Sequence, residues 1–110
     1  AGAELAGVSG SPGVARGTAR IVLDPGDPTA LEPGDILVAP YTDPSWTPLF
    51  MTAGAVVVDV GGQISHAVIV SRELGLPCVV SATGATEVIP QGATVEVNGD
   101  TGLVTVLDVP

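Results

Sequence analysis

The sequence has 110 residues, of which 45% are hydrophobic and only 3% aromatic, and a net charge of −9. This length favours one domain with an aliphatic core, and the acidic charge excludes nucleic-acid binding and disfavours anionic membranes. No apolar run is long enough to span a bilayer, so no membrane role is expected. The single cysteine, Cys78, excludes an intrachain disulfide and points to a reducing compartment, the cytoplasm.

The N-terminal third is predicted to hold two short strands separated by loops and turns. Residues 8–17 (VSGSPGVARG) are glycine-rich and predict a loop. Residues 18–24 (TARIVLD) alternate apolar and polar side chains, which predicts a half-buried strand. Residues 25–35 are turn-rich, and the short apolar run ILVAP (36–40) predicts a buried strand.

A helix is predicted within residues 42–54 (TDPSWTPLFMTAG). Thr42 or Asp43 can accept hydrogen bonds from the free N–H groups of its first turn. Trp46 and Phe50 stand four positions apart, so we expect them to pack together in the core.

The centre of the chain predicts a βαβ unit. AVVVDV (55–60) is a continuous β-branched run, typical of a strand covered on both faces. A helix over 65–74 and a second buried strand over 77–81 follow, so the two strands should be parallel. Residues 82–92 predict a loop with one helical turn, and residues 94–108 predict a hairpin. The pattern indicates a mixed α/β domain with a parallel core and an antiparallel portion.

His66 is the only histidine of the chain, and it stands at the expected start of the helix 65–74. Ser65 is the expected N-cap, and the free N–H groups of the first turn carry a partial positive charge. That charge disfavours a charged imidazolium and attracts an anion, phosphate in particular. Gly61 and Gly62 lack a Cβ and allow a large ligand to come close. These features suit a histidine that is transiently phosphorylated.

The same pattern allows plainer interpretations. A lone histidine in the first turn of a helix is more often a capping or surface residue than a catalyst. A metal site is disfavoured, because one His and one Cys leave only carboxylates as further ligands. A serine hydrolase and a dinucleotide site are disfavoured, because neither G-x-S-x-G nor G-x-G-x-x-G is present.

Three segments carry a family resemblance: GDILVAP (34–40), TDPSWTP (42–48) and GGQISHAVIVSRELGLPCVV (61–80). In this order and spacing they resemble the mobile phosphohistidine domain of phosphoenolpyruvate-utilising enzymes. That family includes phosphoenolpyruvate synthase, pyruvate phosphate dikinase, the first enzyme of the sugar phosphotransferase system and rifampin phosphotransferase. Residues 11–22 and 91–107 also match, so the resemblance covers nearly the whole chain.

The resemblance implies the swivelling β/β/α fold, with a parallel central sheet, an antiparallel portion and flanking helices. Residues 1–110 would be one such domain, a fragment of a larger dikinase-type phosphotransferase. His66 would take a phosphoryl group at one active site and deliver it at another. The partners would be an ATP-grasp nucleotide-binding domain and a substrate- or phosphoenolpyruvate-binding domain. Those domains would hold Mg²⁺ and ATP or phosphoenolpyruvate, and this domain would bind no cofactor or metal itself.

The resemblance also assigns site residues. Gly61, Gly62, Ser65 and Ala67 would form the phosphate-binding loop around His66. The sequence names neither the donor nor the acceptor, which differs among family members and is pyruvate, water or an antibiotic.

Two further positions are open to more than one interpretation. Ile64 stands where many family members have Thr, so a side-chain hydrogen bond to the imidazole or phosphate would be missing. Thr42 and Asp43 open a helix that the family places near the loop, so they would line the site, although capping is the simpler role.

Two rival functions remain at this point: a non-catalytic interaction module, for which Ile64 would be the sign, and a gating domain of the same architecture. An exposed His66 at a helix start favours the carrier function. A buried His66 bonded to a carboxylate favours the rivals. Arg72 is expected to form a structural ion pair or a domain contact rather than to bind phosphate, and Cys78 is expected to be inert.

Overall fold

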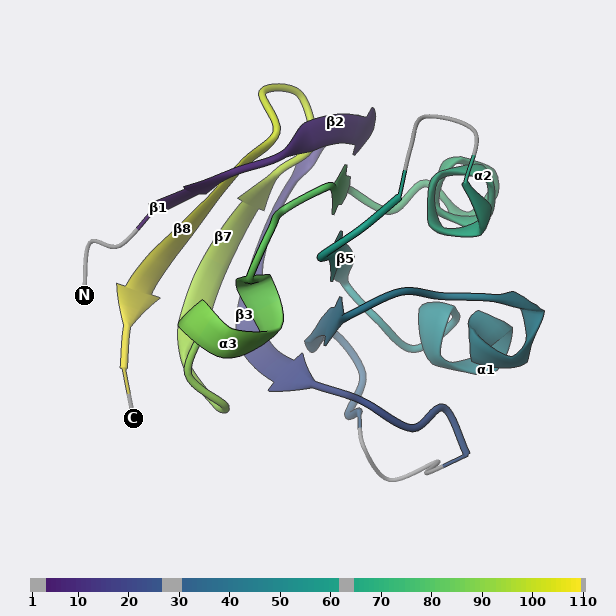
Figure 1. Cartoon of the computed structure of the whole chain (residues 1–110), viewed down its shortest axis with the longest axis horizontal. Helices are drawn as coiled ribbons and strands as arrows, with labels where there is room; N and C mark the ends of the chain where they lie inside the picture. The colour runs from purple at the N-terminus through teal and green to yellow at the C-terminus, as the bar shows by residue number, and fades with distance from the viewer. Residues whose placement is uncertain (1–3, 27–30, 62–64, 110) are drawn as a thin grey trace.

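A computed structural model describes residues 4–26, 31–61 and 65–109. Its strands are β1 (Glu4–Ala6), β2 (Val8–Ser11), β3 (Val14–Ile21), β4 (Ile36–Ala39), β5 (Ala55–Val58), β6 (Cys78–Val80), β7 (Thr94–Asn98) and β8 (Leu103–Asp108). Its helices are the 3₁₀ turn η1 (Pro44–Trp46), α1 (Thr47–Phe50), α2 (His66–Leu74) and α3 (Ala85–Val88) (Figure 1). Within these residues, no helix is long and apolar enough to cross a membrane.

The strands form one bent sheet in the order β1-β8-β7-β3-β4-β5-β6-β2. β3 joins its two halves, because Val14–Thr18 pairs antiparallel with β7 and Ala19–Ile21 pairs parallel with β4. β4, β5 and β6 are parallel, whereas β7 and β8 form an antiparallel hairpin. The predicted parallel core with an antiparallel portion is therefore confirmed.

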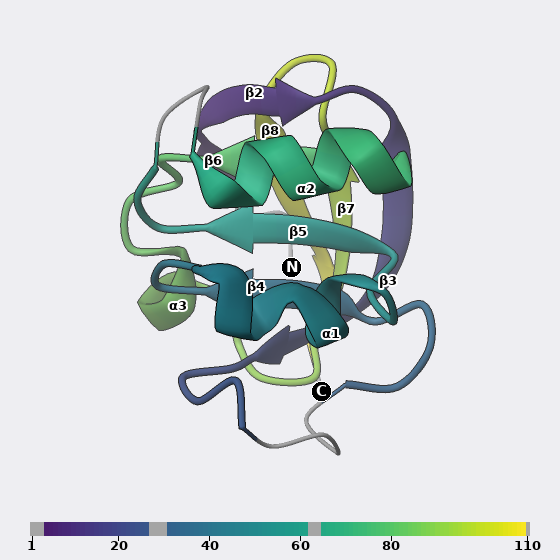
Figure 2. The same cartoon turned by 90° about the vertical axis from the view of Figure 1, so that its right-hand side faces the viewer.

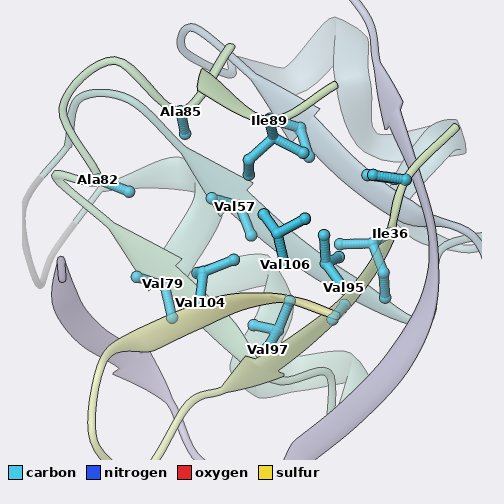
Figure 3. Packing of buried hydrophobic residues seen from close by; sticks show 14 residues of the cluster. Ile36, Val57, Val79, Ala82, Ala85, Ile89, Val95, Val97, Val104 and Val106 are labelled. Atoms are coloured by element: carbon cyan, nitrogen blue, oxygen red, sulfur yellow. The ribbon is translucent and has the colours of Figure 1, made fainter. Parts of the chain in front are cut away.

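The bend produces three layers (Figure 1): the antiparallel strands, the parallel strands, and helices α1 and α2. Side chains alternate along β4, where Ile36 and Val38 face the antiparallel layer while Leu37 and Ala39 face the helices. Figure 3 shows the first of these two apolar clusters, in which side chains from β4, β5 and β6 meet those from β7 and β8. Because both faces of the parallel strands are buried, their sequences are continuous apolar runs.

Helices α1 and α2 cover the same face of the parallel strands (Figure 2). Trp46 and Phe50 are both buried in the apolar cluster beneath them, as their spacing predicts. α2 ends at Gly75, whose φ of 73° is left-handed, and the strands on either side of α2 are parallel. The predicted βαβ unit is thus confirmed, as are the hairpin and the helical turn before it.

The prediction of a loop over residues 8–17 is wrong, because β2 and the first half of β3 lie there. Gly10 and Gly17 permit close packing within these strands, whereas Gly13, with a φ of 115°, lies in the turn between them. A Cβ at Gly10 would lie 2.8 Å from Cγ2 of Val68 and 3.3 Å from the carbonyl oxygen of Cys78. Glycine therefore lets β2 lie against both α2 and β6. The predicted strand 18–24 is the second half of β3, which ends at Ile21.

The helix predicted within 42–54 is shorter and broken, with η1 followed by the four-residue α1. Pro48 explains the break, because proline has no N–H and would disrupt the interior of a helix that began at Asp43. The strand predicted over 55–60 ends at Val58, and the strand predicted over 77–81 is limited to Cys78–Val80.

Candidate functional site

His66 lies at the carboxyl-terminal edge of the parallel strands, where it is the first residue of α2. Ser65 occupies the N-cap position with an extended backbone, and the helical hydrogen bonds begin with Ile69 N–H donating to the Ser65 carbonyl at 3.1 Å. The N–H groups ahead of Ile69 have no carbonyl partner within the helix, and they give this end of α2 a partial positive charge. The His66 side chain is half-buried.

Three side chains from the preceding βα segment surround the imidazole. Oγ1 of Thr42 lies 3.0 Å from Nδ1, and Oγ1 of Thr47 lies 3.4 Å from Nε2. The Phe50 ring packs edge-on, with its centroid 5.5 Å from that of the imidazole and an interplanar angle of 73°. Among the described residues the ring bonds to hydroxyls and not to a carboxylate. This is the arrangement that favours the carrier function over its rivals.

Thr47 was not among the residues expected at the site. Thr42 and Thr47 are five positions apart. If one continuous helix started at Asp43, the two side chains would not be expected to contact the same imidazole ring. Thr42 lies before the extended N-cap Asp43, outside the helical turns, whereas Thr47 is the first residue of α1, and both hydroxyls contact the His66 ring.

The two residues proposed as site lining or cap have separate roles in the structure. Thr42 contacts the imidazole, whereas the Asp43 carboxylate caps η1 by accepting from Ser45 N–H at 2.9 Å. Hydrogen bonds from the hydroxyl and N–H of Ser45 lower the pKa of the Asp43 carboxyl below its ordinary value, and nearby His66 adds to this effect. Asp43 therefore keeps its charge close to the site.

Gly61 has a backbone conformation that favours glycine, with a φ of 134°. A Cβ there would lie 3.2 Å from Oγ of Ser65, and the Gly61 carbonyl accepts a 2.6 Å hydrogen bond from the Ser81 hydroxyl. Oγ of Ser65 is itself buried and has no hydrogen-bond partner in the part of the chain that the structure describes. The Ala67 side chain packs in the core, so only its backbone can face a ligand. Gly62 and Ile64 lie outside the described residues.

The three arginines of the sequence make structural contacts. Nε of Arg16 lies 2.6 Å from a Glu96 carboxylate oxygen, and Nε of Arg20 lies 3.1 Å from one of Asp35. Nε of Arg72 donates to the Gly10 carbonyl at 2.8 Å, so its contact is structural but is a hydrogen bond to the backbone instead of an ion pair. The positive potential next to His66 thus comes from the N-terminus of α2 rather than from these side chains.

Cys78, the other potential nucleophile, is buried beneath α2. Burial raises the pKa of its thiol to about 11, and the Ser71 hydroxyl and Arg72 oppose this only in part. A protonated, buried thiol is a poor nucleophile and a poor metal ligand. Across residues 4–26, 31–61 and 65–109, no three His, Cys, Asp or Glu side chains gather in a way that could hold a metal.

The architecture defines a β/β/α domain, and its only histidine stands at a helix N-terminus. Residues 31–102 match the family described as "PEP-utilising enzyme, mobile domain", and this chain belongs to that family.

Two curated relatives and one solved structure support the assignment. The chain is 47% identical over 100 residues to a probable phosphoenolpyruvate synthase of Staphylothermus marinus, which covers 89% of this chain. It is 44% identical over 103 residues to a rifampicin phosphotransferase of Bacillus cereus, which covers 94% of this chain. The solution structure of an Enzyme I protein superposes with a TM-score of 0.64 and 31% identity, over 74% of this chain and 34% of that one.

The relatives are much longer than the chain described here. The chain spans 12% of the length of each of these two curated relatives. Those proteins therefore contain other domains in addition to the one that this chain resembles.

Proposed function

We propose that this chain is the phosphoryl-carrier domain of a multidomain phosphotransferase and that His66 carries the phosphoryl group. The observation that carries the proposal is the half-buried imidazole at the N-terminus of α2, bonded to two threonine hydroxyls. The names of the relatives, phosphoenolpyruvate synthase and rifampicin phosphotransferase, support phosphoryl transfer as the reaction of the parent enzyme.

In the proposed reaction, an imidazole nitrogen of His66 attacks the phosphorus of the donor. An N–P bond forms, the P–O bond to the leaving group breaks, and its electron pair departs with the oxygen. The N–H groups at the start of α2 face a growing negative charge that they can stabilise. An acceptor oxygen then attacks the same phosphorus, and the N–P electron pair returns to the imidazole.

We further propose that an ATP-grasp domain and a substrate- or phosphoenolpyruvate-binding domain of a cytoplasmic parent enzyme supply the two active sites. Mg²⁺ and ATP would be held there, where the metal would neutralise phosphate charge. The charge of −9 fits transient docking against cationic phosphate-binding sites.

The test supplies the chain with the remaining domains of the parent enzyme and with either β-³²P-labelled ATP or ³²P-phosphoenolpyruvate. We expect an acid-labile label on this domain that disappears in His66→Ala and persists in Thr105→Val, a substitution in strand β8. The donor that labels the domain identifies the first half-reaction.

Two results would contradict the proposal. Label that persists in His66→Ala would show that another residue carries the phosphoryl group. Absence of label from either donor, with the chain still bound to its partner domains, would favour the non-catalytic interaction module.

A further inference from the structure

Ser81, the residue that follows β6, has an unusual backbone conformation. Its φ is 52°, and every other residue with a positive φ in the described ranges is a glycine. A left-handed backbone costs free energy in a residue that has a Cβ, whereas glycine adopts it freely. A serine at this position therefore calls for an interaction that glycine could not supply.

The path of the chain explains this conformation but not the serine. Val79 packs against the antiparallel layer, and Val80 faces the helices. In a straight strand Ala82 would also face the helices. Instead, Ala82 packs in the same cluster as Val79, and its N–H donates to the Val58 carbonyl at 3.1 Å. The left-handed turn at Ser81 produces this reversal, and glycine would produce it at lower cost.

The Ser81 hydroxyl makes the interaction that glycine lacks. It donates to the Gly61 carbonyl at 2.6 Å, between the ends of β6 and β5. Gly61 has a positive φ of its own, 134°, and a Cβ there would lie 3.2 Å from Oγ of Ser65, the N-cap of α2. Strained residues persist where the surrounding structure holds them, and they concentrate at functional sites. The strained Ser81 is thus bonded to the residue that lies against the start of α2, just before His66.

The Gly61 carbonyl lies near groups that an anion would use. Oγ of Ser65 is buried and has no partner in the described part of the chain, and the first N–H groups of α2 have no partner inside the helix. A carbonyl oxygen carries a partial negative charge and accepts hydrogen bonds from such donors. If Ser81 released it, the Gly61 carbonyl could turn toward these donors and take the place of a phosphoryl oxygen.

We propose that Ser81 is a positioning residue whose hydroxyl holds the Gly61 carbonyl at the end of β6 and so keeps the donors at the N-terminus of α2 available for a phosphoryl group on His66. The role in transfer rests on the proposed carrier function. The hydrogen bond and the strained backbone that it offsets do not.

Nuclear magnetic resonance of the ¹³C,¹⁵N-labelled chain tests the hydrogen bond directly. Ser81→Gly removes the hydroxyl and the cost of the left-handed backbone together. We expect the carbonyl ¹³C signal of Gly61 to move upfield, because a short hydrogen bond is lost. The midpoint of unfolding in urea should equal or exceed that of the wild type, because relief of strain offsets the lost bond.

Phosphoramidate, a small reagent that phosphorylates histidine, tests the site without any partner domain. A ring nitrogen of His66 forms the new N–P bond, the N–P bond of the reagent breaks, and its electron pair leaves with ammonia. We expect ³¹P spectra to show phosphorylation of wild-type His66. Ser81→Gly should react about fivefold more slowly, which corresponds to the loss of about 1 kcal/mol from one hydrogen bond.

Ser81→Thr should give the opposite pattern. Threonine keeps the hydroxyl, but its β-branched side chain fits a left-handed backbone poorly. The urea midpoint should therefore fall, whereas the rate of phosphorylation should stay close to that of the wild type. Ser71→Ala is the control, because it removes a buried hydroxyl that has no partner among the described residues, and it should leave the rate unchanged.

Any one of four results would overturn the inference. They are an unchanged Gly61 signal in Ser81→Gly, a wild-type rate in Ser81→Gly, a rate that falls as much in Ser81→Thr as in Ser81→Gly, and a wild-type His66 that phosphoramidate does not phosphorylate. Labelling by ATP or phosphoenolpyruvate with the parent domains separates this inference from the proposed function. If the phosphoramidate results hold but neither donor labels His66, the role of Ser81 stands and the carrier function fails.

Discussion

At the scale of single residues, the two potential nucleophiles of the chain differ in their exposure to solvent. His66 lies half-buried at the positive end of α2, with hydroxyl groups at both nitrogens. Cys78 lies beneath the same helix with its side chain fully covered. The difference follows from their positions, since one residue begins the helix and the other lies in the strand that the helix covers.

The raised pKa of Cys78 predicts slow alkylation and a pH-dependent stability. Near pH 9 the thiol should be about half ionised in the unfolded chain but only about 1% ionised in the folded one, whose pKa is about 11. Iodoacetamide should therefore react far more slowly with the native chain than with the denatured chain.

The sign of the stability effect follows from the same values. The pKa of the thiol in the folded chain is above the ordinary 9.0. The stability gained by burying the neutral thiol is therefore complete below pH 9 and is lost as the pH rises toward 11. The free energy of unfolding should fall by roughly 2–3 kcal/mol over this interval. Urea titrations of the wild type and Cys78→Ala measure it, and an equal fall in Cys78→Ala would assign the loss to other groups.

At the scale of elements, the junction between β5 and α2 sets the position of His66. Gly61 has its φ of 134° next to Ser65, and the Ser81 hydroxyl ties the Gly61 carbonyl to the end of β6. The residue that follows β5 near Ser65 is thereby tied to the end of β6.

Gly61→Ala should disturb this junction. The φ of 134° is unfavourable for a residue that has a Cβ, and the added Cβ would lie only 3.2 Å from Oγ of Ser65. We expect a loss of about 1–3 kcal/mol in the free energy of unfolding and a change in the ring signals of His66. Gly34→Ala is the matched control, because Gly34 has a φ of 88° but no atom within 4 Å of its added Cβ. A loss of stability in both variants with unchanged His66 signals in Gly61→Ala would contradict the link to the site.

At the scale of the whole molecule, one N-terminal segment closes the sheet. β1 pairs with β8 at one edge and β2 pairs with β6 at the other, although only Gly7 separates them in the chain. Figure 1 shows this segment crossing from the antiparallel layer to the parallel layer near α2. The hydrogen bond from Arg72 to the Gly10 carbonyl joins α2 to the same segment.

Gly10→Ala should therefore weaken the whole domain. The new Cβ would lie 2.8 Å from Cγ2 of Val68, which is 0% exposed and has little room to move. Overpacking of this kind costs about 1–3 kcal/mol. Gly26→Ala is the control, since its Cβ would meet only the Asp24 side chain in an exposed turn. Equal unfolding midpoints for Gly10→Ala and the wild type in urea would contradict the closing role of this segment.

Local patterns in the sequence were enough to predict the βαβ unit, the C-terminal hairpin and the start of α2 at His66. Each depends on neighbouring residues: the β-branched run of β5, the glycine that ends α2, and the alternation in β7 and β8. The first strands were missed because their glycines serve contacts with residues that lie far away in the chain, such as Val68.

The amino-acid sequence by itself determined that a helix begins at His66 and ends at Gly75, because both ends follow from local hydrogen-bonding requirements of a helix. Only the tertiary structure decided what holds His66. Thr42 and Thr47 are 24 and 19 positions before His66 in the chain. They reach its ring because helices α1 and α2 pack on the same face of the parallel strands, and no local pattern encodes that packing.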